Sequence, residues 1–411
     1  MGLHLVGGIS SAGRAVPPLD GRPLLIDRAE GPWLWDRDGR RYVDTALGFG
    51  ATILGHGPEP VIDATTAAIR SGSMPAFAHA GEEAAASALA ALTAPLTSVV
   101  FTSTGSEAVH LAARIARVAT GRGLVAKMAA GYDGWYDDVT LGQAGSAEAL
   151  MRANSRPRRG GTLLLRYNDF EDVERLFAES DDIAAVLIEP MLANAGCVPA
   201  APGYLAHVAA VARRHGALVI SDEVLMGFRL RAGLTAPAEG VEPDLATVGK
   251  AIGSGFAVAA VVGRPDVMRA AEGAGVRAGT YSGNPVATAA VLATLAELKA
   301  ADYPALLARG DRLRAAIVAA FAAIGRSVST SGFGTVFTLW FADRAPTTYA
   351  EAAAIADAEL TRRWHLALRR RGALVMPFPF GRLYLSFSHD EPVCAELASV
   401  VAASAGDLDG A

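Results

Sequence analysis

The sequence DLATVGKAIGSGFAVAA (residues 244–260) places one lysine, Lys250, between two glycines and directly after an apolar run. Most lysines are solvated surface charges, so a single Gly-Lys pair says little about function. Lys250, however, interrupts a stretch of low charge from Ala246 to Val262, and the glycines allow a ligand to approach the backbone closely. We therefore treat Lys250 as a candidate functional residue and search the chain for its partners.

Short apolar runs like the one before Lys250 recur along the chain and alternate with Ala- and Leu-rich helical stretches. Each run is too short for a helix and is bounded by turn residues, which predicts a β-strand. The predicted strands are residues 98–102, 123–128, 162–166, 184–189, 217–222, 245–249 and 259–263. Buried strands that alternate with helices predict an α/β fold with a mostly parallel seven-stranded sheet, covered on both faces.

The two ends of the chain follow other patterns. Residues 33–44 alternate around an Asp-Gly turn and predict a hairpin. After residue 286, two long helical stretches (286–299 and 303–324) precede the apolar segments 334–341 and 382–388, which indicates a smaller α+β domain. The predicted organisation is an N-terminal arm with part of the small domain (1–44), a large cofactor-binding domain (45–290) and a C-terminal small domain (291–411).

The composition is typical of a soluble globular enzyme, with 51% hydrophobic and 19% charged residues in 411. A net charge of -5 gives no electrostatic reason to expect nucleic acid as a partner. The densest basic cluster, Arg369–Arg371, is predicted to be an exposed helix end before Gly372. The eight histidines are scattered without Cys/His ligand spacing, so we expect no metal site.

Several features predict a cytoplasmic protein. Cys197 and Cys394 cannot make a disulfide framework, which favours a reducing compartment. The N-terminal residues lack the cationic start and apolar core of a signal peptide. No apolar run is long enough to span a bilayer, so no membrane association is expected.

In open α/β sheets the ligand binds beyond the carboxyl ends of the strands, so the residues at these ends are the candidate site. After strand 98–102 comes Ser103-Thr104-Gly105-Ser106, followed by an amphipathic helix. Free amides at a helix start, together with hydroxyls and a glycine, make a phosphate cradle. An ordinary capping box with Glu107 explains the same residues, so the phosphate site is preferred only together with other features.

Two more strand ends supply such features. Asp222 stands at the rim of the sheet, where burying it is costly without a cationic partner, and a protonated heteroaromatic nitrogen is one such partner. For Glu223, a solvated position in a loop is equally compatible with the pattern. Tyr132 and Trp135 lie in a Gly- and Asp-rich loop and can stack on a flat ligand, although packing in the core is the alternative.

A phosphate cradle, a carboxylate, an aromatic face and one isolated lysine together match the needs of pyridoxal phosphate. The lysine forms a Schiff base with the aldehyde, the acid keeps the pyridine nitrogen protonated, and the helix end anchors the phosphate. We therefore expect pyridoxal 5'-phosphate as the cofactor.

Over nearly its whole length the sequence resembles the class III (ω-type) pyridoxal-phosphate aminotransferases of fold type I, and within them the glutamate-1-semialdehyde aminomutase branch. The matching segments occur in order and are GISSAGRAV (8–16), GPWLWDRDGRRYVD (31–44), ILGHGP (53–58), STGSEA (103–108), YDGWYDD (132–138), IEPMLANAGCVP (188–199), HGALVISDEVLMGFR (215–229), PDLATVGKAIGSGF (243–256) and GTYSGNP (279–285).

The resemblance implies roles for individual residues. Lys250 carries the Schiff base and shuttles the proton, Asp222 pairs with the pyridinium nitrogen, and Val224 packs on the ring opposite Tyr132. The other implied contacts are Thr104, Gly105 and Ser106 to the phosphate, Glu189 and Asn194 to the ring and its phenolic oxygen, Gly279 and Thr280 to the phosphate of the neighbouring subunit, and Ser11, Arg14, Phe49 and Trp135 to the substrate. A homodimer with shared active sites follows from the contacts of Gly279 and Thr280.

The chain departs from the family pattern at several positions. Asp133 stands where the family has histidine, which removes an imidazole near the ring. Leu225-Met226 replaces the usual Met-Thr, and Phe49 stands where the branch usually has tryptophan. Gly381 stands where the aminomutase branch has glutamate. This last change bears on the substrate pocket and weakens the aminomutase assignment more than the cofactor assignment.

The preferred hypothesis is an aminotransferase that takes nitrogen from a donor such as glutamate and aminates a ketone or aldehyde by a ping-pong route. An oxidised amino sugar or another secondary-metabolism carbonyl is the expected kind of acceptor. The alternative is an isomerase, either an aminomutase or an amine epimerase, which uses the same lysine and cofactor and differs in needing no separate donor. A catalytically silent binding protein is disfavoured because Lys250 and Asp222 are both present.

Overall fold

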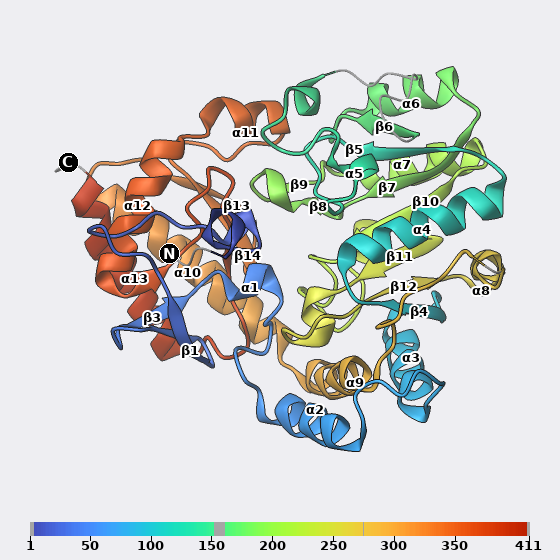
Figure 1. Ribbon diagram of the computed structural model, residues 1–411. Coiled ribbons are helices and arrows are strands. Elements are labelled where there is room, and N and C mark those ends of the chain that lie inside the picture. The colour runs from blue at the N-terminus through green and yellow to red at the C-terminus, as the bar shows by residue number, and fades with distance from the viewer. Residues whose placement is uncertain (1–3, 152–160, 274, 409–411) are drawn as a thin grey trace.

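A seven-stranded sheet forms the centre of the larger part of the molecule (Figure 1). The computed structural model describes residues 4–151, 161–273 and 275–408. The strand order is β4-β12-β11-β10-β7-β5-β6. The bounds are β4 Ser98–Thr102, β5 Leu124–Met128, β6 Thr162–Leu165, β7 Ile183–Ile188, β10 Leu218–Glu223, β11 Leu245–Val248 and β12 Ala259–Gly263. All seven predicted strands are confirmed, with ends that differ by at most one residue.

The sheet is mostly parallel, as predicted. Only β12 runs against its two neighbours, β11 and β4. Because β12 returns antiparallel to β11, the connection between them lies entirely at the carboxyl edge of the sheet, and Lys250 is part of this connection.

Helices cover both faces of the sheet, because alternate side chains of each strand point to opposite sides. On β7, Ala185 and Leu187 pack toward α4 (Gly105–Thr120), whereas Val186 and Ile188 belong to the core under α6 (Phe170–Glu179) and α7 (Tyr204–Arg214). The layer of α6 and α7 is continued under β11, β12 and β4 by α3 (Ala80–Thr93) and α9 (Pro285–Ala300) (Figure 1). The fully apolar strands of this sheet therefore have no solvated face.

The smaller part of the molecule contains two small sheets. One has the order β1-β2-β3-β15, and the other has the order β13-β14-β16. The strands are β1 Ile26–Glu30, β2 Trp33–Asp36, β3 Arg41–Asp44, β13 Ser329–Phe333, β14 Val336–Trp340, β15 Ala373–Leu374 and β16 Leu383–Tyr384. The antiparallel pairing of β2 with β3 confirms the predicted hairpin. Both ends of the chain contribute to one sheet, because β15 pairs in parallel with β3. The predicted boundaries at residues 45 and 291 remain a proposal.

The remaining elements connect or cover these sheets. Helices α9 and α10 (Tyr303–Ala323) confirm the two predicted long helices. The other helices are α1 Leu47–Gly50, α2 Glu59–Ser71, α5 Asp137–Thr140, α8 Pro265–Met268, α11 Tyr349–Ile355, α12 Ala358–Arg371 and α13 Glu391–Ala405. The short strands β8 Met191–Leu192 and β9 Val198–Pro199 pair with each other.

The basic cluster at the end of α12 corrects one expectation. The helix ends at Arg371 and Gly372 caps it in the left-handed conformation, but Arg369 is buried rather than exposed. Its guanidinium donates a hydrogen bond to the carbonyl oxygen of Pro17 at 3.0 Å. The N-terminal segment therefore covers one face of a helix whose sequence alone indicates a solvated end.

Both cysteines, Cys197 and Cys394, are buried free thiols. Within the described residues, the structure contains no helix with the length and apolar character needed to cross a bilayer.

Candidate active site

A cavity of about 200 Å³ lies at the carboxyl edge of the seven-stranded sheet. Its walls come from the start of α4, the loop after β5, the residues that follow β7 and β10, and the connection after β11. The lining residues are Gly105, Ser106, Val109, Tyr132, Asp133, Gly134, Glu189, Asn194, Asp222, Val224, Leu225, Met226 and Lys250. The structure thus brings together most of the residues that the sequence places at the cofactor. Thr104, Gly279 and Thr280 do not line this cavity.

Lys250 begins the 3₁₀ turn η6 (Lys250–Gly253) and adopts a left-handed backbone with φ of 42°. This conformation is strained for a residue with a side chain, and such strain is often found at functional sites. Burial lowers the pKa of the Lys250 amine to about 8, and the positive charges of Arg382 and Arg229 act in the same direction. The lowered pKa increases the fraction of the amine that is unprotonated near neutral pH, and this form can attack a carbonyl carbon.

Asp222, at the end of β10, is held by one of its two carboxylate oxygens. Oδ1 accepts hydrogen bonds from the backbone N–H of Val224 and the hydroxyl of Thr247, both at 2.9 Å. Among the described residues, no hydrogen bond reaches Oδ2, although the side chain is only 6% exposed. Burial, reinforced by the charge of Asp133, raises the pKa of the Asp222 carboxyl to about 7. A cationic N–H group in the cavity would give Oδ2 its missing partner.

Glu223, the next residue, is buried at the end of β10 and does not lie in a solvated loop. Its carboxylate accepts hydrogen bonds from the backbone N–H groups of Thr235 and Ala236. Burial raises the pKa of Glu223. Glu223 therefore fixes the loop at Thr235 and Ala236, and it does not line the cavity.

The start of α4 combines both alternatives that the sequence left open. Thr104 caps the helix and forms a capping box with Glu107, whose carboxylate accepts from the N–H groups of Ser103 and Thr104. Gly105 and Ser106, in the first turn, nevertheless line the cavity. A Cβ on Gly105 would lie 2.8 Å from Cγ1 of Val224, so only glycine leaves this wall open. The capped helix presents its N-terminus to the cavity, where an anion is favoured.

The loop after β5 brings an aromatic ring to the cavity. Tyr132 is 43% exposed, and its backbone N–H donates to Oε1 of Glu189 at 3.2 Å. The N–H of Trp135 donates to the hydroxyl of Ser106 at 3.3 Å, but the indole is 75% exposed and does not line the cavity. Burial, together with the negative charges of Asp133 and Asp222, raises the pKa of Glu189 well above its usual range, which favours the protonated carboxyl.

The substrate residues expected from the resemblance lie outside the cavity. Ser11 and Arg14 are exposed on the N-terminal arm, around the 3₁₀ turn η2 (Ala12–Arg14). A Cβ on Gly13 would lie 3.7 Å from Cζ of Phe49, which places the arm against the Phe49 ring. Phe49 is half-buried and adopts a left-handed backbone with φ of 58°.

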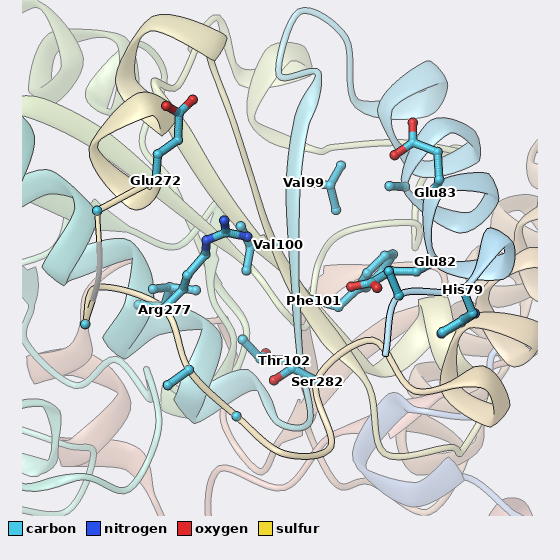
Figure 2. Close-up of a pocket in the computed structure, with 17 residues that line it drawn as sticks. His79, Glu82, Glu83, Val99, Val100, Phe101, Thr102, Glu272, Arg277 and Ser282 are labelled. Carbon is cyan, nitrogen blue, oxygen red and sulfur yellow. The ribbon is translucent and has the colours of Figure 1, made fainter. Parts of the chain in front are cut away.

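Gly279 lines a second cavity, of about 610 Å³, at the outer edge of strand β4 (Figure 2). Figure 2 shows Arg277 and Glu272 on one side of the strand and Glu82 and Glu83 of α3 on the other. Thr280 follows in the same loop. The two residues expected at the neighbouring subunit thus lie beside an uncovered sheet edge and not in the cavity around Lys250.

Two charged residues that the sequence reasoning did not identify lie near the cavity. Arg382 is half-buried, and its guanidinium donates from Nε to the Tyr384 hydroxyl at 2.7 Å and from Nη1 to the Ala193 carbonyl oxygen at 3.1 Å. Lys127 is completely buried on β5 and pairs with Asp133. Two features of the sequence could have identified these residues. Arg382 directly follows Gly381, a position that departs from the family pattern, and Lys127 is a single charged residue in an apolar strand. No cluster of His, Cys, Asp or Glu in the described part of the chain could hold a metal ion.

Comparison with known proteins agrees with this geometry. The family model for aminotransferase class-III matches residues 17–357. The fold is similar to an omega-transaminase from Sphaerobacter thermophilus, with 28% identity, a TM-score of 0.88, and coverage of 99% of this chain and 95% of that one. It is similar to a β-phenylalanine aminotransferase from Variovorax paradoxus, with 28% identity, a TM-score of 0.86, and coverage of 98% and 91%. A glutamate-1-semialdehyde aminomutase from Pseudomonas aeruginosa PAO1 in complex with PMP gives 25% identity, a TM-score of 0.85, and coverage of 95% and 89%.

Proposed function

Because the chain belongs to the class-III aminotransferase family and is thus a pyridoxal-phosphate-dependent enzyme, we propose that it moves an amino group from an amino-acid donor to a ketone or aldehyde. The observation that carries the proposal is the arrangement of Lys250 and Asp222 around one cavity. Each side chain lacks what the cofactor supplies, which is an aldehyde for the amine and a cationic N–H for Oδ2 of Asp222. The bound cofactor supplies an electron sink that stabilises negative charge on the carbon that carries nitrogen.

The residues of this chain then have distinct roles in the proposal. Lys250 would hold the cofactor through its amine and would move a proton to and from the substrate carbon that carries nitrogen. Asp222, oriented by Thr247 and Val224, keeps the ring nitrogen protonated. Gly105 and Ser106, with the capping residue Thr104, bind the phosphate at the N-terminus of α4.

The remaining cofactor residues position the ring. Tyr132 and Val224 form opposite walls for the ring, as the family resemblance implies, and both line the cavity. Glu189 and Asn194 lie beside them and are proposed to contact the ring and its phenolic oxygen. The raised pKa of Glu189 supports a neutral carboxyl that donates a hydrogen bond there.

Arg382 supports a donor that carries a carboxylate, with glutamate as the first candidate. In the described chain no carboxylate forms an ion pair with Arg382, and its partners are a hydroxyl and a backbone carbonyl. A half-buried guanidinium without an anion is costly, and a substrate carboxylate would offset this cost. The positive charge of Arg382 also lowers the pKa of the Lys250 amine, which supports a role for Arg382 close to that amine. Ser11, Arg14, Phe49 and Trp135 are proposed to complete the substrate side.

The acceptor is proposed to differ from that of the aminomutases. A Cβ on Gly381 would lie 2.6 Å from the carbonyl oxygen of Met376 and 2.8 Å from that of Phe378. The glutamate of the aminomutase branch therefore does not fit here without a backbone shift. A specialised carbonyl, such as an oxidised amino sugar or another secondary-metabolism intermediate, is the acceptor class we propose.

We also propose a homodimer that shares its active sites and works in the cytoplasm. Gly279 and Thr280 lie beside the exposed edge strand β4, which a second copy would cover. Phe77 and Tyr281, near the same cavity, are 84% and 66% exposed, as expected of rings that a partner buries. The two free, buried cysteines support a reducing compartment.

The decisive experiment is the absorbance spectrum of the purified protein before and after addition of L-glutamate without any acceptor. We expect the yellow absorbance of the cofactor to disappear while one equivalent of 2-oxoglutarate is released per site. If the yellow band persists with every common donor while a candidate amine exchanges its α-proton with solvent, the isomerase hypothesis replaces the aminotransferase.

A further inference from the structure

Lysine is rare in this chain, and its placement is selective. The sequence contains three lysines, Lys127, Lys250 and Lys299. Lys299 is exposed near the end of α9. The other two lie at the carboxyl edge of the same sheet. Lys250 lines the cavity, and Lys127 is the second-last residue of strand β5, before the loop that carries Tyr132. A second lysine at this edge needs its own explanation.

The Lys127 ammonium is the centre of a buried polar cluster. Nζ donates hydrogen bonds to the carbonyl oxygens of Gly131 and Val139 at 3.0 Å and of Leu141 at 3.4 Å. Oδ2 of Asp133 lies 3.0 Å from the same nitrogen, and neither side chain of the pair is more than 2% exposed. Three carbonyl oxygens from both ends of one loop thus converge on one ammonium group.

Asp133 connects this cluster to the cavity. It lines the cavity beside Tyr132, and a Cβ on Gly131 would lie 3.3 Å from its Oδ2 and 2.8 Å from Oε1 of Glu189. Three carboxyl groups, those of Asp133, Glu189 and Asp222, therefore share the walls of one small cavity. Burial raises the pKa of the Asp133 carboxyl, and the positive charge of Lys127, 3.0 Å away, opposes this shift.

We propose that Lys127 and Asp133 are positioning residues, which tie the loop of residues 129–141 into one conformation and thereby hold Tyr132 in the cofactor cavity. The loop begins at the end of β5, and the ammonium bonds to residue 131 on its outgoing side and to residues 139 and 141 on its returning side. The proposal rests on the proposed function where it assigns the cavity to pyridoxal phosphate. The tying of the loop is independent of that assignment.

A purely structural ion pair is the competing explanation, and the two differ in what a neutral replacement restores. Replacing a buried ion pair by apolar side chains of similar size is often neutral for stability, whereas removing one partner is strongly destabilising. Apolar side chains cannot bond to the carbonyl oxygens of Gly131, Val139 and Leu141. The double replacement therefore separates stability from loop position.

The test compares Lys127→Met, the double variant Lys127→Met/Asp133→Leu and the control Lys299→Met with the unmodified protein. Hydrogen exchange of residues 129–141 is measured in the cofactor-free protein, and the dissociation constant for pyridoxal phosphate is measured by absorbance titration. We expect Lys127→Met to lower the melting temperature and the double variant to recover most of it. In both, loop exchange should be at least tenfold faster and cofactor binding at least tenfold weaker, while Lys299→Met should match the unmodified protein.

Recovery of loop protection and of cofactor affinity in the double variant would overturn the proposal, because the pair would then serve stability alone. If Lys127→Met does not fold, the double variant decides by itself. Failure of the unmodified protein to bind pyridoxal phosphate would contradict the proposed function instead, and the exchange of residues 129–141 would still decide whether Lys127 ties the loop.

Discussion

Asp222 and Arg382 both act on Lys250 by their charge, but the structure holds them in different ways. Asp222 is the second-last residue of the central strand β10. It is fixed by hydrogen bonds from Thr247 on the neighbouring strand β11 and from Val224, just after β10. Arg382 directly precedes the two-residue strand β16. Its guanidinium is held by hydrogen bonds to the Tyr384 hydroxyl and to the carbonyl oxygen of Ala193, which is 189 residues away in sequence. The proposed cofactor side is thus built around one sheet, and the proposed substrate side comes from distant, partly exposed segments.

This difference predicts which residues determine substrate specificity. Changes on the cofactor side should affect every substrate, because all of them react at the same lysine. Changes on the substrate side should affect only substrates that carry the matching group. The four variants below test this division, in order of decreasing effect.

Lys250→Ala is expected to have the largest effect and to be indifferent to the substrate. It should lower turnover by roughly 10⁴-fold, because it removes the group that moves the proton as well as the covalent attachment of the cofactor. Mass spectrometry after borohydride reduction should find the cofactor on Lys250 in the unmodified protein and on no residue of the variant. Turnover within tenfold of the unmodified protein would contradict the mechanism.

Asp222→Asn should lower kcat by roughly 100-fold with all donors, through loss of a charge-assisted hydrogen bond to the ring nitrogen. It should also stabilise the cofactor-free protein. Because the folded pKa of Asp222 is raised from 3.8 to about 7, its contribution to stability is present at low pH and is lost as pH rises from about 4 through 7. The advantage of the variant in free energy of unfolding should therefore grow over this range, to at most about 4 kcal/mol.

Urea unfolding at pH 4.5, 6 and 8 measures this advantage, with Asp266→Asn, at an exposed aspartate, as the matched control. A difference between Asp222→Asn and the unmodified protein that stays constant with pH would show that burial does not raise the pKa of Asp222.

Arg382→Ala should divide substrates by charge. With glutamate as donor, kcat/KM should fall by roughly 10- to 100-fold, as expected for loss of a hydrogen-bonded charge pair. With isopropylamine, which has no carboxylate, it should change by less than about threefold. Steady-state kinetics with both donors check the split, and an equal loss with both would assign Arg382 to the cofactor side of the comparison.

Arg14→Ala should have the smallest effect, less than about fivefold on kcat/KM with any donor, because Arg14 is exposed on the N-terminal arm. The same two-donor kinetics measure it. A loss as large as that of Arg382→Ala would show that the arm closes over the substrate and that the substrate side has a second carboxylate-binding arginine.

Local patterns were sufficient to predict the sheet and several residues that line the cavity, and the family resemblance supplied Val224, Glu189 and Asn194. Short apolar runs identify the seven strands. Asp222 is the second-last residue of β10, and Gly105 lies three residues after the end of β4. Parallel strands bring their carboxyl ends to one edge whatever the rest of the chain does. The capping box at Thr104 was also local, and the structure shows that a cap and an open helix N-terminus are compatible.

The residues that sequence reasoning missed depend on contacts between distant segments. The Lys127 side chain is stabilised by carbonyl oxygens of a loop whose path no periodicity indicates. Arg369 is buried because the N-terminal segment covers it, and Arg382 lies near the cavity because it bonds to the carbonyl oxygen of Ala193, which is distant in sequence. Glu223 was as well explained by a solvated loop because its partners, Thr235 and Ala236, lie beyond the local motif.

The parallel pairing of β15 with β3 has a consequence for making hybrid enzymes. The segments proposed for the substrate side come from both ends of the chain. The pairing of β15 with β3 joins these ends in one sheet, so a change in one strand must be compatible with the other. A chimera that takes only its C-terminal portion from a relative would pair the relative's β15 with this chain's β3 and would replace Arg382 without changing the N-terminal segments. Exchanging both ends together, while keeping the central sheet, should change the substrate-side segments and leave Lys250 and Asp222 in place.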